Sequence, residues 1–315
     1  MVADCLAGLA EQAVPRAAVE VILVDDGSTD HTGSIGKEWG ARVISQHRQG
    51  PAAARNAGAW AARGELLLFT DADCVPAPDW IAQMSKPFAD PTVVGVKGAY
   101  RSRQRSLVAR FVQLEYEDKY ERMEGAGDID FIDTYSAAYR RSIFLQHGGF
   151  DTQFPTASVE DQELSFRLAE AGQRMVFNPQ AIVFHQHPDT WQRYWRRKFG
   201  VGFWKVRVLA QHPEKTVYDT HTPQSLKAQM AWVMGAPLLA IAARRGRPGR
   251  GLLALLVAGY GVLVGPFVHK AWRNDRPVAA VAPVLLLLRA WALGLGLIAG
   301  VFERVVGSEN TEVSD

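Results

Sequence analysis

The first half of the chain alternates short apolar runs with polar breaks. Residues 66–69, Leu-Leu-Leu-Phe, are apolar at every position, which is typical of a buried parallel strand. Strands are also expected at residues 20–26 and 41–45, and helices at residues 3–13 and 51–63. Strands that alternate with helices predict an α/β domain with a mostly parallel, Rossmann-like sheet.

The same alternation continues through the middle of the chain. The remaining elements expected before the composition changes are strands at residues 92–100, 132–139, 174–178 and 181–185, and helices at residues 79–84, 106–124 and 158–172. The last of these helices has Leu164, Leu168 and Ala171 on one face and ends at Gly172. We expect this α/β domain to occupy residues 1–190.

Aromatic and basic side chains interleave from Trp191 to Arg207. This composition suits a lipid interface, where amphipathic rings lie at headgroup depth and cations meet anionic lipid. Nucleic-acid binding is the alternative, and nothing else in the sequence supports it. We therefore expect an interfacial segment at residues 191–227 and no nucleic-acid partner.

Three apolar segments follow, at residues 228–243, 252–268 and 277–302, the third with Arg289 inside it. A spanning helix needs about 17–25 apolar residues, so the third segment is long enough, the second is marginal and the first is short. We expect residues 228–315 to form a membrane region with an acidic tail.

Charge predicts the sides of this membrane region. Arginines fill the connector after the first segment, at positions 244, 245, 247 and 250, which favours a cytoplasmic connector. The second and third segments would then form a hairpin, although the basic loop between them fits the rule imperfectly, and three spans remain an alternative. The α/β domain is expected on the cytoplasmic side.

Composition adds little beyond this. The formal net charge of +2 over 315 residues does not argue for a nucleic-acid partner. Cys5 and Cys74 cannot supply a four-cysteine zinc site or a disulfide framework, and they fit a reducing cytosol. The first twelve residues contain Asp4 and Glu11 and lack a basic start, so no secretory signal is expected.

Acids gather where two of the predicted strands end. Asp71 and Asp73 follow one strand, and Asp25 and Asp26 close another. Ligands of open α/β sheets bind beyond the carboxyl ends of the strands, and carboxylate oxygens suit Mg²⁺ or Mn²⁺. The alternatives are an Asx turn at Asp71 and Asp73 and helix capping at Asp25 and Asp26; we favour ligand contact for both pairs.

Other polar residues have two interpretations each. Glu160 and Asp161 lie in the first turn of a helix, where Ser158 and Asp161 resemble a capping box and a capped turn can also present a base. His185 and His187 point the same way if their strand continues, either as structural groups or as ligands of a metal or diphosphate. Arg55 is either a surface residue or a contact to a nucleotide.

Several motifs in this order resemble those of family 2 glycosyltransferases with the GT-A fold. They are Val24-Asp25-Asp26-Gly27-Ser28-Thr29-Asp30, Ala54-Arg55-Asn56-Ala57-Gly58, Thr70-Asp71-Ala72-Asp73, Gly148-Gly149-Phe150-Asp151 and Glu160-Asp161. Each motif alone is weak, but their order over residues 24–161 is specific for the family and uninformative about the sugar.

The resemblance implies a role for each matching position. Asp25 and Asp26 would hold the nucleoside, Asp71 would contact the ribose or the metal, and Asp73 would ligate the cation that bridges the donor phosphates. Asp161 would be the general base with Glu160 in support. His185 falls near a histidine that lies close to the metal in many relatives, and His187 is expected at the substrate.

Two features depart from the family. Its opening strand is missing before Met1; the alternatives are a misassigned start, which we favour, and an incomplete nucleotide pocket. Processive relatives carry Gln-x-x-Arg-Trp, whereas residues 192–196 read Gln-Arg-Tyr-Trp-Arg, which argues against a polymerising synthase.

The combined expectation is a membrane-associated, metal-dependent, inverting glycosyltransferase. It would move a sugar from a UDP- or GDP-sugar to a hydroxyl of a lipid-linked or glycan acceptor, with Mg²⁺ or Mn²⁺ as cofactor. The alternatives are a polyprenyl-phosphate sugar synthase of the same fold, for which Asp161 would not act as a base, and an inactive membrane-bound scaffold or nucleotide-sensing module.

Overall fold

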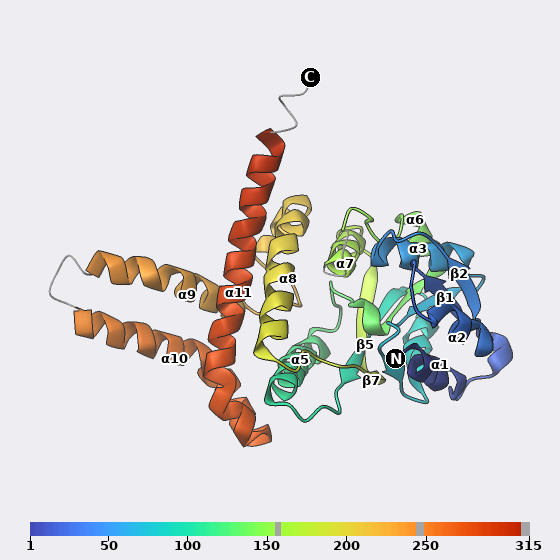
Figure 1. Ribbon diagram of the computed structural model, residues 1–315, viewed down its shortest axis with the longest axis horizontal. Helices are drawn as coiled ribbons and strands as arrows, with labels where there is room; N and C mark the ends of the chain where they lie inside the picture. Colours follow the sequence, from blue (N-terminus) through green and yellow to red (C-terminus); the bar gives the residue numbers. More distant parts are fainter. Residues whose placement is uncertain (155–158, 244–248, 310–315) are drawn as a thin grey trace. The chain divides into compact units, whose positions relative to one another are not determined.

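The computed structural model describes residues 1–154, 159–243 and 249–309, and they form two compact units (Figure 1). Unit 1 comprises residues 1–103, 117–186 and 219–221, and unit 2 comprises residues 104–116, 187–218 and 222–315. These units are defined by contacts between residues and not by function. The predicted boundaries at residues 190 and 227 between a catalytic, an interfacial and a membrane part therefore stay a prediction.

A two-stranded parallel sheet opens unit 1. Strand β1 (Ile22–Asp25) pairs with β2 (Arg42–Ser45) in register, from Ile22 opposite Arg42 to Asp25 opposite Ser45. The helices that flank this sheet in the sequence are α1 (Val2–Ala10), α2 (Thr32–Glu38) and α3 (Pro51–Ala61). The predicted elements are confirmed here, with ends that move by up to three residues.

The larger sheet has the strand order β3-β6-β5-β7-β4. Its strands are β3 (Leu66–Phe69), β4 (Val75–Pro76), β5 (Val93–Arg101), β6 (Ala137–Arg140) and β7 (Arg174–Phe184). Only β5 and β7 pair in parallel; β3 with β6, β5 with β6, and β4 with β7 are antiparallel. The prediction of a parallel strand at 66–69 is therefore wrong in direction, because an apolar run reports burial of both faces and not the direction of its neighbour.

Three other predicted strands differ in extent. The strands expected at 174–178 and 181–185 are one strand, β7, which ends at Phe184. It continues past Asn178-Pro179 by an irregular step, with Lys97 opposite Phe177 and Ala99 opposite Ile182. The strand expected at 132–139 is shorter, because a 3-10 turn, η3 (Thr134–Ser136), precedes β6.

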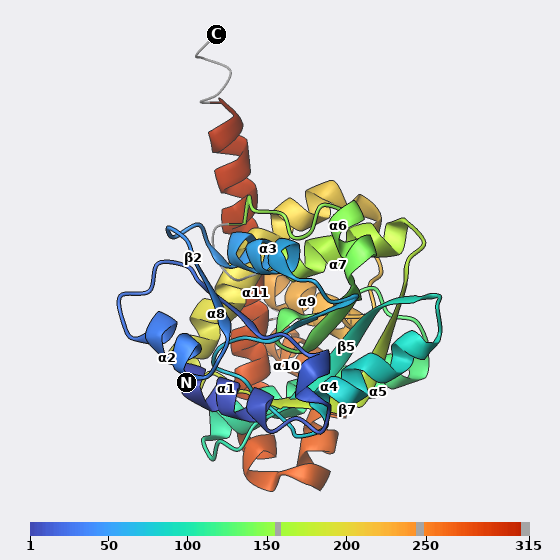
Figure 2. The same cartoon turned by 90° about the vertical axis from the view of Figure 1, so that its right-hand side faces the viewer.

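Helices cover both faces of the strands in unit 1. Figure 2 shows α3, α6 (Arg141–Gln146) and α7 (Glu160–Glu170) on one side, and α1 and α4 (Trp80–Ser85) on the other. The core joins β3, β6, α6 and α7, with side chains that include Leu67, Tyr139, Phe144, Phe150 and Leu164. Fixing the carboxyl end of β3 against α7 in this way brings polar residues of both elements together.

Unit 2 is helical. Its helices are α8 (Trp191–Gln211), α9 (Gln224–Ala243), α10 (Gly249–Asn274) and α11 (Arg276–Glu309), and it also holds the first part of α5 (Leu107–Ala126). The α8 and α11 helices lie side by side and meet at glycines, where a Cβ on Gly296 would be 2.3 Å from the carbonyl oxygen of Phe199 (Figure 1).

Arg289 in the apolar helix α11 is buried with polar partners. Its Nη1 lies 2.6 Å from Glu115 Oε1 and its Nη2 lies 2.7 Å from Gln229 Oε1. Tyr194 and Lys198 of α8 also approach Glu115, at 2.9 and 3.3 Å. Part of the predicted interfacial segment is thus committed to packing within unit 2.

Two helices in the described residues are long and apolar enough to cross a membrane, at Ala254–Asn274 and Arg276–Val306. They match the second and third predicted segments, and the first, at residues 228–243, is not among them. Half of the apolar window in α11 is buried within the structure, against 11% in α10. Most of the arginine connector used to predict topology, residues 244–248, lies outside the described residues.

Candidate active site

The acids at the end of β1 organise the turn that follows them. Asp25 Oδ1 accepts a hydrogen bond from the backbone N–H of Ser28 at 2.8 Å, across Gly27, whose φ of +76° suits a glycine. Asp26 accepts hydrogen bonds from the Gln46 side chain at 2.7 Å and from the backbone N–H groups of Gln49 and Gly50 at 2.8 Å each. Both acids thus accept hydrogen bonds from neighbouring turns, and their contact with a ligand stays a prediction.

The Asp26 carboxylate is stabilised in its ionised form. Burial opposes ionisation, but the hydrogen bonds from Gln49, Gln46 and Gly50, together with the charge of Arg48, outweigh it and lower the pKa of Asp26. An ionised Asp26 thus fixes the end of β1 to the first residues of α3.

Arg55 on α3 joins two of the predicted site acids. Its Nη2 lies 2.8 Å from Asp71 Oδ1, after β3, and its Nη1 lies 2.7 Å from Glu160 Oε1, in the first turn of α7. The guanidinium is mostly buried, which opposes its charge, but Asp71 and Glu160 raise its pKa above the ordinary value. Arg55 is therefore not a plain surface residue, which was one of its two interpretations; it bridges α3, β3 and α7. Its contact with a nucleotide stays a prediction.

Asp161 is buried beside this bridge. Its Oδ1 accepts from the backbone N–H of Gln162 at 2.8 Å and its Oδ2 from that of Thr134 at 3.4 Å. Burial and the neighbouring Glu160 and Asp133 raise its pKa well above the usual aspartate value, and the cations Arg55 and Lys97 only partly oppose this. Ser158, the other half of the predicted capping box, lies outside the described residues.

A buried ion pair that sequence reasoning missed lies against Asp161. Lys97 Nζ, in the middle of β5, is 2.5 Å from Asp133 Oδ2, and the two side chains are 1% and 3% exposed. The available signal was a lysine inside the otherwise apolar run Val93 to Tyr100, because a charge in a buried strand requires a partner.

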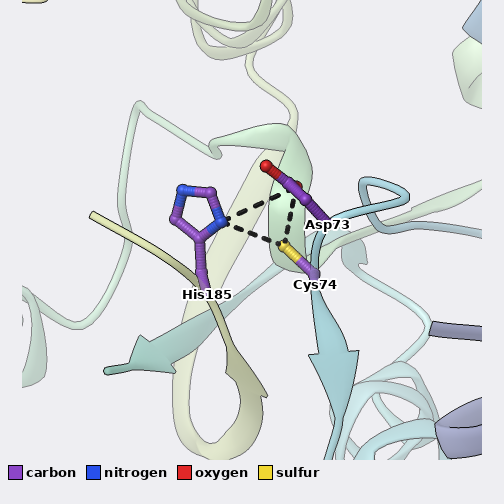
Figure 3. A group of neighbouring side chains, drawn as sticks. All are labelled: Asp73, Cys74 and His185. Atoms are coloured by element: carbon purple, nitrogen blue, oxygen red, sulfur yellow. Dashed lines mark hydrogen bonds and ion pairs between the residues drawn. The ribbon is translucent and has the colours of Figure 1, made fainter. Parts of the chain in front are cut away.

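Asp73, Cys74 and His185 form a second cluster, drawn in Figure 3. His185 Nδ1 lies 3.6 Å from Asp73 Oδ1, and Cys74 Sγ lies 3.6 Å from His185 Nδ1 and 3.8 Å from Asp73 Oδ1. Cys74 was not predicted as part of the site. Burial and the charges of Asp71 and Asp73 raise the pKa of its thiol.

This cluster fits a divalent cation with one change from the predicted ligands. Asp73 and His185 offer an oxygen and a nitrogen to one point, as expected, whereas Asp71 is engaged by Arg55 and Cys74 takes the third place in the group. Oxygen and imidazole nitrogen are ligands that Mn²⁺ and similar ions accept.

His187 packs among residues of unit 2. Strand β7 ends at Phe184, so the alternation that predicted a common direction for His185 and His187 does not continue. The Nε2 of His187 lies 3.0 Å from Gln113 Oε1 and its ring stacks on Tyr116, both contacts being within unit 2. A role for His187 at the substrate stays a prediction.

A cavity of about 670 Å³ lies between β1, β3, α1 and α3. Its lining is mostly apolar and includes Leu6, Leu23 and Leu67; among the predicted site residues it reaches Arg55 and Asp71 alone. We therefore place the candidate active site at the two polar clusters and not in this cavity.

Comparisons with known proteins show which family the chain resembles. The family described as "Glycosyl transferase family 2" matches residues 1–148. The chain is 30% identical over 304 residues to the pre-mycofactocin glycosyltransferase of Mycobacterium tuberculosis, covering 93% of this chain and 61% of that protein. It is 34% identical over 210 residues to glycosyltransferase AglE of Haloferax volcanii, covering 65% of this chain and 68% of that protein. The chain thus spans about three fifths of the mycobacterial relative.

A solved structure shares the fold. The mannosyltransferase PcManGT from Pyrobaculum calidifontis, in complex with GDP-Man and Mn²⁺, superposes with a TM-score of 0.58 at 23% identity, over 96% of this chain and 83% of that one. The architecture is thus the α/β fold of GT-A glycosyltransferases. The chain belongs to glycosyl transferase family 2.

Proposed function

We propose that the chain transfers a sugar from a UDP- or GDP-sugar to a hydroxyl of a membrane-associated acceptor, with inversion at the anomeric carbon and with a divalent cation. The observation that carries the proposal is the Arg55 bridge, which ties Asp71 on the donor side to Glu160, the neighbour of Asp161. One charged network thereby couples the residues assigned to the leaving diphosphate with those assigned to the attacking hydroxyl.

Donor binding is assigned to the strand ends. Asp25 and Asp26 would contact the nucleoside, and Asp71 the ribose, while Asp73 and His185 would hold Mg²⁺ or Mn²⁺ at the diphosphate. Such a cation, when bound, neutralises the charge that develops on the leaving group. The complex of the Pyrobaculum mannosyltransferase with GDP-Man and Mn²⁺ supports this choice of donor class and metal by similarity of fold.

Asp161 is assigned the role of general base. The acceptor oxygen forms a bond to the anomeric carbon from the face opposite the phosphate, the bond from that carbon to the phosphate oxygen breaks, and the acceptor proton passes to the Asp161 carboxylate. The raised pKa of Asp161 supports this role, because a base of higher pKa accepts a proton more readily. Glu160 is a positioning residue that acts through Arg55.

The acceptor is assigned to the membrane on the basis of α10 and α11, whose apolar windows satisfy the length of a spanning helix. A transferase anchored in this way, with unit 1 on the cytoplasmic face, would meet soluble nucleotide-sugars and lipid-linked or glycan acceptors. Membrane lipids are then partners of unit 2.

The test is transfer by the full chain in detergent micelles, with a panel of UDP- and GDP-sugars and a lipid extract as acceptor. We expect Asp161→Asn to lower kcat by about 10²–10⁴-fold for a hydroxyl acceptor. Glu163→Gln, a buried acid two residues further along the same helix that pairs with Arg167, is the matched control and should keep wild-type turnover.

Two other outcomes would replace the proposal. Full activity of Asp161→Asn with a polyprenyl phosphate as acceptor would identify a polyprenyl-phosphate sugar synthase. An ionised phosphate attacks without losing a proton and needs no base. Absence of transfer and of nucleotide release with every donor would identify a scaffold or nucleotide-sensing module.

A further inference from the structure

Cys74 lies in the candidate active site with no role in the proposed transfer. Its side chain is fully buried, and its Sγ forms a triangle with His185 Nδ1 and Asp73 Oδ1 whose sides are 3.6, 3.6 and 3.8 Å (Figure 3). A sulfur, a nitrogen and an oxygen that face one point are a different ligand set from the oxygen-rich one that Mg²⁺ prefers.

The dimensions of this triangle match tetrahedral coordination. With zinc–ligand bonds of about 2.3 Å to sulfur and about 2.1 Å to nitrogen and oxygen, tetrahedral angles place the ligand atoms about 3.4–3.6 Å apart. An octahedral Mg²⁺ site, with bonds of about 2.0–2.1 Å at right angles, would bring neighbouring ligands to about 2.9 Å. The observed sides are therefore close to the tetrahedral spacing and well above the octahedral one.

The ligand atoms are held in place by their surroundings. The His185 ring stacks on Tyr135 at 5.4 Å and meets the edge of Tyr100 at 5.9 Å, while its backbone N–H donates to Arg101. The backbone N–H of Cys74 donates to the carbonyl of Asp71 at 3.0 Å, which fixes the loop after β3. Metal binding at this position needs little rearrangement of the protein.

We propose that Cys74, His185 and Asp73 form a three-ligand tetrahedral site for a thiophilic divalent ion of the Zn²⁺ class, with the fourth position open to water or a ligand oxygen. On binding, the Cys74 thiol loses its proton to solvent and the thiolate coordinates the ion, while neutral His185 coordinates through Nδ1. Zinc stands above manganese and magnesium in affinity for such nitrogen and sulfur ligands.

A consequence for catalysis follows, and it rests on the proposed function. Because Asp73 and His185 are also the ligands assigned to the catalytic cation, a bound Zn²⁺ would displace Mg²⁺ or Mn²⁺ and inhibit transfer. Removal of the thiol would then relieve inhibition by zinc.

The experiment uses Co²⁺ as a spectroscopic substitute for Zn²⁺ in the metal-free full chain, without any sugar or acceptor. We expect the intense visible bands of tetrahedral Co²⁺ and a sulfur-to-cobalt charge-transfer band in the near ultraviolet, both removed by an equivalent of Zn²⁺. A spectrum of octahedral Co²⁺ without a sulfur band would overturn the proposal. This result comes from the wild-type protein and does not depend on any variant or on transferase activity.

Two cysteine variants complete the test. Cys74→Ser should abolish the charge-transfer band and weaken Zn²⁺ binding by about 100-fold or more, measured by competition with a chromophoric chelator. Cys5→Ser removes the other buried thiol of the chain and should leave the spectrum and the affinity unchanged. Zinc affinities of Cys74→Ser and wild type within threefold of each other would refute a thiolate ligand.

Discussion

Replacement of Arg55 by methionine tests the network that joins the two sides of the candidate active site. The side chain of Arg55 is 14% exposed, and its partners Glu160 and Asp71 are 3% and 31% exposed. Arg55→Met removes the guanidinium and leaves the Glu160 carboxylate buried without it. Removal of one partner from a buried ion pair typically costs about 3–5 kcal/mol, and we expect a loss of that size in unit 1.

The expected loss can be separated from a general effect of charge removal. Arg63 forms an ion pair at the surface, with its Nε 3.3 Å from Glu20 Oε2, and its side chain is 82% exposed. Arg63→Met should therefore cost about 0–1 kcal/mol. The double variant Arg55→Met/Glu160→Gln removes the buried charge together with its partner, so it should be less destabilised than the sum of the single variants by at least about 1 kcal/mol.

Hydrogen–deuterium exchange is the appropriate assay, because it reports local free energies of opening for peptides of β3 and α7 and does not require the whole chain to unfold in one step. A change below about 1 kcal/mol for Arg55→Met, or strict additivity with Glu160→Gln, would refute the argument that this bridge fixes α7 against β3.

Three further predictions concern other parts of the structure. Because burial, together with Glu160 and Asp133, raises the pKa of Asp161, kcat/KM should rise with pH through a midpoint above the usual aspartate value, and an unshifted midpoint would contradict this. The stability that the protonated Asp161 contributes is complete at low pH and is lost as pH rises through its folded-state pKa, so thermal scans should find Asp161→Asn more stable relative to wild type at high pH. Lys97→Met should lower exchange protection of β5 by about 3–5 kcal/mol by removing the partner of buried Asp133; wild-type protection would contradict it. Gly296→Val should lower the Tm of unit 2, with a cost of about 1–3 kcal/mol, whereas Gly200→Ala, with open space around it, should not; equal effects would sink the packing argument.

The location of most elements could be predicted from the sequence, but strand direction could not. Residues 66–69 form a strand as the apolar run predicted, and its antiparallel pairing with β6 is set by an element seventy residues away. Local pattern records burial and period, while the choice of neighbour depends on the whole chain. Residues Asn178-Pro179 likewise predicted a break between two strands. Pairing with β5 instead keeps β7 continuous there, with an irregular step in its register.

The chemistry of the candidate site was predicted in part. The acids were found because two at the end of one strand exceed what a turn needs. The bridging role of Arg55 could not be predicted, because its partners Asp71 and Glu160 lie 16 and 105 residues away in the sequence. No local pattern encodes such contacts. Lys97 had a signal, as a charge in an apolar strand, whereas Cys74 resembled an ordinary buried thiol until His185 was placed beside it.

Asp73, with a divalent cation, is proposed to hold the diphosphate of a nucleotide-sugar. Isothermal titration of GDP and UDP into the full chain, with and without Mn²⁺, tests it most directly, with Asp79→Asn, at the start of α4, as the control for loss of a nearby acid. We predict that Mn²⁺ tightens binding of one nucleotide by about tenfold or more, and that Asp73→Asn removes this coupling while Asp79→Asn preserves it. Nucleotide affinity that is independent of Mn²⁺, or coupling that survives in Asp73→Asn, would contradict the account.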